Sequence, residues 1–321
     1  MRTDARDLLA ECDVLDIHSE SSVWSRLIGY EVADRHGRGL LGGRLYSQAD
    51  LPRMREGGLT GAVLSIATNP LRREPVLSQN VARLVASLGG AAVVTDAAEY
   101  RRARAEGRFA CFVAVQGGNA VASVDGFPAV VSRVTLVHLT RSRIGAPSAP
   151  LGGGGGLTPF GREFVAGLNQ RRVLVDLAHA NAPTFWDALD AHDRSLPPIV
   201  SHTGVSGVHR SWRNIDDRQV RAIADRGGVV GIMFHRGFVG GPTAEDVVRH
   251  LEHVVAVGGE DAAAVGSDWD GMIVTPRDMP TAAEFPVLVQ RMLDRGWTPD
   301  RVAKVVGRNY LRVIDAVRPA S

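Results

Sequence analysis

Residues 171–205 read RRVLVDLAHANAPTFWDALDAHDRSLPPIVSHTGV and contain the unit from which the rest of the chain is built. A short apolar, β-branched run at 173–177 is followed by an amphipathic segment at 182–191 and by a second short run at 199–202. Short apolar runs of this kind are typical of buried strands, and the longer segment between them has the periodicity of a helix. Two strands joined through a helix form a parallel pair with a crossover connection.

The same alternation extends across the chain in both directions. Eight runs are predicted as strands, at 14–18, 61–68, 110–115, 134–138, 173–177, 199–202, 228–234 and 263–268. Helical periodicity is found at 74–88, 159–170, 182–191, 216–226 and 244–257, and again after the last strand at 281–295 and 299–317. Eight strand–helix units in 321 residues predict an α/β fold of the (β/α)8 TIM barrel type. We expect one domain over 1–321, with closing helices at its C-terminal end.

Two features favour the closed barrel over other arrangements. A doubly wound open sheet is the alternative, but no G-x-G-x-x-G follows the first strand to indicate a dinucleotide site. The glycine run at 152–156 falls within a strand–helix unit, between the fourth and fifth strands. It therefore predicts a mobile loop at the barrel mouth and not a linker between domains.

Composition excludes several classes of protein. Apolar residues make up 45% of the chain and charged residues 22%, which is typical of a soluble globular protein with a large core. A net charge of only +2 with scattered basic residues argues against nucleic-acid binding. The N-terminal segment lacks the apolar run of a signal peptide, and no apolar stretch is long enough to span a membrane. With only Cys12 and Cys111, neither a disulfide framework nor a thiolate site is expected, and the location predicted is cytoplasmic.

Polar residues that can bind a metal gather at the C-terminal ends of the predicted strands. In a TIM barrel these ends meet at the mouth that holds the active site. The residues at this edge are His18, Glu20, Gln116, His138, His179, His202 and Asp268. A single histidine at a strand end is more often structural than a ligand, so only the joint pattern carries weight. Imidazole and carboxylate groups together suit zinc, manganese or iron and leave a coordination position for water.

Sequence motifs in a fixed order span nearly the whole chain. They are DIHSE at 16–20, DLPRMREGG at 50–58, QGG at 116–118, VTLVH at 134–138, GLTPFGRE at 156–163, VDLAH at 175–179, VSHTGV at 200–205, RN at 213–214 and VGSDWDG at 265–271. In content and order this series resembles the zinc-dependent membrane dipeptidase family. The resemblance implies a metallo-dependent hydrolase barrel, commonly a homodimer, that cleaves a dipeptide or a related small amide.

The resemblance also implies roles for individual residues. His18 and Glu20 would hold one metal ion, and His179 and His202 the other. The family's glutamate that bridges both ions is replaced here by Gln116. The two residues implied to bind a carboxylate-bearing substrate are His138 and Arg213, and the residue implied to transfer protons near the metal-bound water is Asp268.

Departures from the family pattern leave three functions open. An amide at position 116 has no charge to offset the repulsion between two cations, so at least one of the two metal sites should be weakened. The number of zinc ions held is therefore one or two. Glu20 is one methylene longer than the aspartate of the family and is a candidate to compensate for the lost bridge. The first function is a dipeptidase-like metallohydrolase. The second is a relative with an altered or mononuclear site that performs a different tailoring reaction on a small carboxylate-bearing amino-acid or peptide derivative, and the third is a non-catalytic binding protein.

Overall fold

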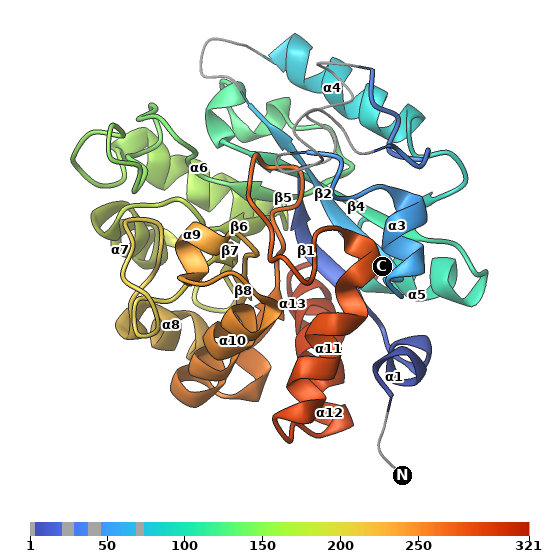
Figure 1. Cartoon of the computed structure of the whole chain (residues 1–321). Helices are drawn as coiled ribbons and strands as arrows, with labels where there is room; N and C mark the ends of the chain where they lie inside the picture. The colour runs from blue at the N-terminus through green and yellow to red at the C-terminus, as the bar shows by residue number, and fades with distance from the viewer. Residues whose placement is uncertain (1–3, 21–28, 38–45, 69–73, 321) are drawn as a thin grey trace.

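Parallel strands form a ring with helices around its outside (Figure 1). The computed structural model describes residues 4–20, 29–37, 46–68 and 74–320. Around the ring the strands follow the order β1-β2-β4-β5-β6-β7-β8-β9, and a short β3 pairs with β4. Their bounds are β1 Leu15–Ser19, β2 Gly61–Ala67, β3 Ala92–Val93, β4 Ala110–Gln116, β5 Val131–Thr135, β6 Leu174–Asp176, β7 Ile199–Thr203, β8 Val229–Ile232 and β9 Ala263–Val265.

The ring closes where the segment after β9 meets the end of β1. The amide of Asp268 donates to the carbonyl of His18 at 2.9 Å, and the amide of Glu20 donates to the carbonyl of Trp269 at 2.8 Å. Ser19 and Trp269 thus form a parallel bridge beyond the last regular pairing. These bonds confirm the predicted (β/α)8 barrel, and they also bring the polar residues that follow the first and last strands to one place.

Each of the eight predicted strands corresponds to an observed strand, but one prediction was displaced. The run predicted at 134–138 overlaps the observed strand, Val131–Thr135, only at its last two residues, so His138 lies three residues beyond the end of the strand. The displacement arose because Arg133 interrupts the apolar pattern, although its side chain is fully buried. The short strand β3 was not predicted, since two residues give no detectable alternation.

The helices cover the outside of the ring and agree well with the periodicity. They are α1 Ala5–Glu11, α3 Leu51–Glu56, α4 Glu74–Ala86, α5 Ala97–Ala105, α6 Pro159–Gln170, α7 Ala182–Ala191, α8 Asp217–Ala224, α9 Arg236–Val239, α10 Ala244–Gly258, α11 Phe285–Asp294, α12 Pro299–Ala303 and α13 Asn309–Val317. The predicted bounds of α6 and α7 are confirmed, whereas the short helices α1, α3, α5 and α9 were not predicted. None of the helices in the described residues is both long and apolar enough to cross a membrane.

A separate apolar cluster fills the inside of the ring. It takes side chains from strands on all sides and is completed by residues of α13, with members that include Leu15, Val63, Phe112, Leu174, Ile199, Val229, Ala264, Tyr310 and Ile314. A packed interior of this kind is the normal core of a TIM barrel. Arg133 of β5 is in register with Ala114 and Leu174, which both belong to this cluster. A charged guanidinium therefore occupies a position in the barrel where the neighbouring strands supply apolar side chains.

His250 of α10 links this helix to the segments that follow β7 and β8. Its Nδ1 accepts from the amide of Val205 at 2.9 Å, and its Nε2 donates to the carbonyl of Val239 at 3.1 Å. Both bonds require a neutral imidazole with its proton on Nε2. Burial of the ring lowers the pKa of His250 to about 4.

His250 is expected to make stability depend on pH. An unfolded histidine has a pKa of about 6.5, so the unfolded chain takes up this proton first as the pH falls. The stabilisation is complete above about pH 6.5 and declines as the pH falls towards about 4, by about 2–3 kcal/mol. His250→Gln keeps a donor and an acceptor without titrating, so its free energy of unfolding should fall less over this range. Urea unfolding of both proteins across the range measures the difference, and parallel pH profiles would contradict it.

Candidate metal centre

The side chains at the mouth come from the ends of five strands. His18 lies on β1, Gln116 ends β4 and His202 lies on β7. His179 follows β6, and Asp268 follows β9 by three residues. Because the strands are parallel, their C-terminal ends meet on one face of the barrel, and loops supply the residues that follow.

One half of the site is a chain of imidazoles. The Nε2 atoms of His179 and His202 lie 2.8 Å apart. His138 packs edge-on against His179, with ring centroids 4.7 Å apart. The Nε2 of His138 lies 2.8 Å from the amide nitrogen of Gln116. The convergent nitrogens of His179 and His202 are arranged as two ligands of one cation would be.

The other half of the site combines one imidazole with two carboxylates. The Nε2 of His18 lies 3.8 Å from Oε1 of Glu20 and 3.6 Å from Oδ1 of Asp268. All three ligand atoms lie within 4.8 Å of one another. The ring of His18 also stacks on that of His202, with centroids 3.7 Å apart, so the two halves are in direct contact.

Burial sets the charge of these groups. It lowers the pKa values of His18, His179 and His202 well below the ordinary range, and the nearby cationic side chains act in the same direction. Burial also raises the pKa of Glu20 to about 7, and that of Asp268 well above its usual value. A cation held nearby would offset the cost of burying these carboxylates.

On the predicted metal ligands, four buried polar atoms have no hydrogen-bond partner among the described residues. They are Nε2 of His18, Oε1 of Glu20, Oε1 of Gln116 and Nδ1 of His179. Buried polar groups are nearly always paired, so a cluster of unpaired ones points to a ligand or an ion that completes them. This observation, together with the chemistry of the donors, shows that the residues present fit a metal ion.

Two residues of the site, His179 and Asp268, also adopt a strained backbone. His179 has φ 64° and Asp268 has φ 63°, both in the left-handed region. Residues other than glycine adopt this backbone conformation at a cost of about 1–3 kcal/mol. Such residues cluster at functional sites. In this conformation the backbone turns just after β6 and β9, and both side chains lie at the mouth.

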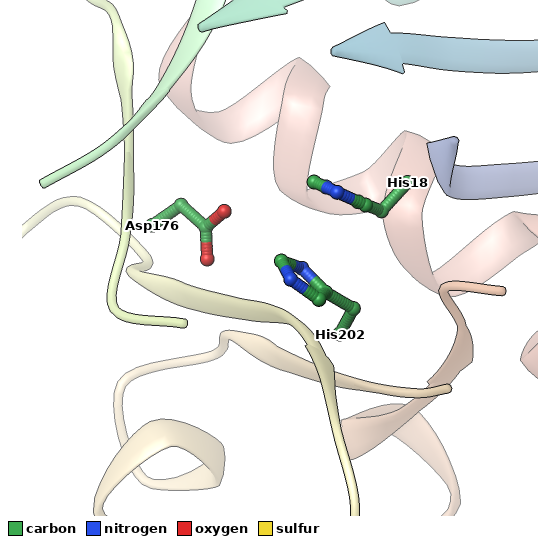
Figure 2. A group of neighbouring side chains, drawn as sticks. All are labelled: His18, Asp176 and His202. Atoms are coloured by element: carbon green, nitrogen blue, oxygen red, sulfur yellow. The ribbon is translucent and has the colours of Figure 1, made fainter. Parts of the chain in front are cut away.

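Asp176 lies close to His18 and His202 (Figure 2) but is fully occupied by the protein. Its Oδ1 accepts from the amides of Ala178 at 3.0 Å and Ser201 at 2.9 Å. Its Oδ2 accepts from the hydroxyls of Thr135 and Ser201, each at 2.6 Å. Because four donors already bind it, this carboxylate is not a free metal ligand. It instead fixes the position of Ser201 beside His202.

Arg133 is the principal site residue that the sequence did not predict. Its Nη2 lies 2.8 Å from Nδ1 of His18, and its Nη1 donates to the carbonyl of Ile17. Its Nε lies 3.6 Å from Oδ2 of Asp176. The signal available in the sequence was a charged residue in a buried apolar run, but the predicted strand began one residue too late to include it.

Arg213 lines a cavity of about 260 Å³ and also contacts the backbone of His202. Its Nη2 donates to the carbonyl of His202 at 2.7 Å. Burial lowers the pKa of Arg213 to about 10, which leaves the guanidinium charged at neutral pH. The cavity is lined by His179 and Arg213 and by the polar groups of Ser148, Ser206 and Asn214, with Trp212 also in the wall.

The structure thus places all eight residues predicted for the site at the mouth. His18, Glu20 and Asp268 form one group, His179 and His202 a second, and Gln116 contacts His138. Arg213 contacts the backbone of His202. The groups are joined through the stacked rings of His18 and His202.

Comparisons with known proteins agree with this architecture. The sequence model of the family described as Membrane dipeptidase (Peptidase family M19) matches residues 2–321. A protein of Klebsiella pneumoniae described as an uncharacterized protein in the pqqA 5' region is 33% identical over 171 residues. That match covers 51% of this chain and 62% of the relative, which is less than two thirds of its length.

Two solved structures are similar over nearly their full length. The metallopeptidase described as dipeptidase AC has a TM-score of 0.83 and 25% identity, over 96% of this chain and 99% of that one. A metallopeptidase from Rhodobacter sphaeroides, solved with a phosphinate mimic of the dipeptide L-Ala-D-Ala, has a TM-score of 0.79 and 24% identity. The match to it covers 95% of this chain and 99% of that one, and at this identity it shows the fold alone.

Proposed function

The chain belongs to the membrane dipeptidase family. We propose that it is a metal-dependent hydrolase of a dipeptide or a related small amide. The observation that carries the proposal is the paired Nε2 atoms of His179 and His202 beside a cavity that contains Arg213. Metal ligands and a cationic side chain at one cavity suit a small substrate with a carboxylate. A cytoplasmic homodimer stays a prediction from the sequence.

The metal would be held by His179 and His202, with Oε1 of Gln116 as the nearby neutral oxygen donor. Zinc, manganese and iron all accept such ligands. A bound ion supplies Lewis acidity towards the scissile carbonyl and a water of lowered pKa. The protein's own contribution is to keep the two imidazoles neutral through burial and to fix His202 through Ser201.

Substrate binding falls to Arg213 and His138. A guanidinium binds a carboxylate through two parallel hydrogen bonds, and the buried position of Arg213 at the cavity strengthens that pairing. His138 lies between Gln116 and His179, where its ring can contact a substrate held near the metal. Because the chain belongs to the membrane dipeptidase family, a dipeptide is the substrate to test first.

Asp268 is the residue proposed to move protons. It lies 3.6 Å from His18, and burial raises its pKa well above the ordinary value. A carboxyl group with a raised pKa can take a proton from water and return it to a leaving amine near neutral pH. The left-handed backbone at this residue holds the carboxylate at the mouth.

A second candidate function is favoured by Gln116. An amide there cannot supply the negative charge that normally bridges two divalent ions. The site would then carry out a different tailoring reaction on a small carboxylate-bearing amino-acid or peptide derivative. Gln116→Glu tests this alternative: appearance of strong dipeptide hydrolysis in the variant alone would favour it, and unchanged hydrolysis would favour the native site as a dipeptidase.

The proposed function is tested by metal content and by hydrolysis of dipeptides. Protein purified without chelators, and again after dialysis against zinc, is analysed for ions per chain. A panel of L,L- and L,D-dipeptides is then assayed with the metal-loaded and the chelated protein. Hydrolysis that requires the metal supports the proposal, and a metal-loaded protein without hydrolysis of any dipeptide would favour the tailoring reaction.

Arg213→Lys is expected to weaken binding of the substrate carboxylate. A lysine keeps the charge but loses the planar pair of donors, so KM for a dipeptide should rise about 10–100-fold, equivalent to about 1.5–3 kcal/mol. Steady-state kinetics with the dipeptide and with its C-terminal amide measure this effect. The amide serves as the control because it lacks the carboxylate. Equal losses on both substrates would show that Arg213 acts only through the backbone of His202.

A further inference from the structure

We propose that Arg133 holds His18 as a hydrogen-bond donor, so that the site keeps one metal position, at His179 and His202. This inference deepens the proposed function and rests on it for the presence of a metal. It assigns a positioning role to a buried arginine below the mouth. It also distinguishes His18 from His202, although the family motifs imply that both are metal ligands.

Arg133 reaches His18 from inside the barrel. Its register with Ala114 and Leu174 directs the side chain into the interior cluster, and the residue is fully buried. Two of its nitrogens contact the first strand, at the carbonyl of Ile17 and at Nδ1 of His18. The position of the guanidinium is therefore fixed on several sides and cannot easily rotate away.

The donor in the contact with His18 must be the arginine. A guanidinium has only N–H donors and no acceptor, so Nδ1 of His18 accepts at 2.8 Å. A neutral imidazole that accepts through Nδ1 carries its proton on Nε2. Nε2 is the atom that faces Glu20 and Asp268, and in this tautomer it has no lone pair for a metal. Metal-ligating histidines normally donate their other nitrogen to an oxygen, which is the opposite arrangement.

His202 is held in the other tautomer by the adjacent residue. Its Nδ1 lies 2.8 Å from the hydroxyl of Ser201, and that hydroxyl donates its single proton to Asp176 at 2.6 Å. The serine oxygen must therefore accept from Nδ1–H of His202, which leaves the lone pair on Nε2. The two stacked rings beside Asp176 (Figure 2) thus present a donor and a metal ligand.

Like Arg133, Gln116 disfavours a second metal ion at His18. A second cation at His18 would lie near the buried guanidinium and would lack an anion at position 116 to offset its repulsion from the first. Instead, the Nε2–H of His18 points between two carboxylates at 3.8 and 3.6 Å. Glu20 and Asp268 then remain free of metal and available for proton transfer.

The tautomer of His18 can be measured in the unmodified protein. Two-bond ¹H–¹⁵N correlations of the imidazole rings distinguish a proton on Nδ1 from one on Nε2, and the signals lost in His18→Gln identify His18. We expect the Nε2–H form in the metal-free protein and again after titration with zinc, while the ring signals of His179 and His202 shift. A proton on Nδ1 of His18, or a zinc-induced shift of its Nε2, would overturn the proposal.

Metal stoichiometry gives a second measurement. The wild-type protein should bind one zinc ion per chain, and Arg133→Lys, which keeps a donor, should also bind one. The double variant Arg133→Gln/Gln116→Glu supplies an acceptor for Nδ1–H and an anionic bridge, and should bind two. Two ions in the wild type would contradict the proposal. A protein that binds no ion and cleaves no dipeptide would instead overturn the proposed function, and the tautomer in the metal-free protein would still be readable.

Discussion

Asp268→Asn is expected to lower kcat for dipeptide hydrolysis by about 10²–10⁴-fold, the usual contribution of a positioned acid–base residue. The amide cannot accept or return a proton, although it keeps the size and the polar character of the side chain. Asparagine also tolerates the left-handed backbone of this position, where φ is 63°. The metal content should stay unchanged, because the proposed ligands are on other strands. Steady-state kinetics and elemental analysis of the same preparation measure both effects.

Asp270→Asn is the matched control for this variant. Asp270 lies two residues further on, shares the left-handed backbone with φ 64°, and is buried, whereas the Asp268 side chain is 13% exposed. Its Oδ1 accepts from the amide of Gln48 at 2.7 Å, a bond that the asparagine oxygen can keep. We expect kcat to change little in this variant. If both variants lost activity to the same degree, the cause would be the geometry of the segment and not proton transfer by Asp268.

The barrel could be predicted because its strands are buried on both faces. Such strands appear in the sequence as short continuous apolar runs, and the helices between them show a clear amphipathic period. The error at β5 has the same origin. Arg133 is charged but points into the barrel, so a method that equates charge with exposure begins the strand after it.

The position of most side chains at the mouth could be predicted, but Arg133 and the tautomers of the histidines could not. Strand ends and family motifs indicated both His18 and His202 as metal ligands, each for one of two ions. Their difference depends on partners that lie far away in the sequence, since Arg133 and His18 are 115 residues apart. The pairing of Ser201 with Asp176 spans 25 residues and depends on the register of two neighbouring strands. Tautomers follow from such contacts, and periodicity carries no information about them.

Replacing His202 with asparagine is expected to weaken zinc binding by more than about 100-fold, beyond the 10–100-fold typical of losing a supporting residue. The variant removes one of the two convergent nitrogens and leaves His179 without a partner at 2.8 Å. Competition with a chromophoric chelator gives the dissociation constant, and unfolding by urea checks that the variant is folded.

Two further variants allow the loss of zinc affinity in His202→Asn to be compared with smaller expected losses. Ser201→Ala keeps both ligands but removes the oxygen that accepts from Nδ1 of His202, so its zinc affinity should fall by about 10–100-fold. His18→Asn removes the ring stacked on His202 without removing a proposed ligand, and its affinity should fall less than about tenfold. The expected order of loss is therefore His202→Asn, then Ser201→Ala, then His18→Asn. If His18→Asn lost as much affinity as His202→Asn, His18 would be a ligand, and the donor state imposed by Arg133 would not hold.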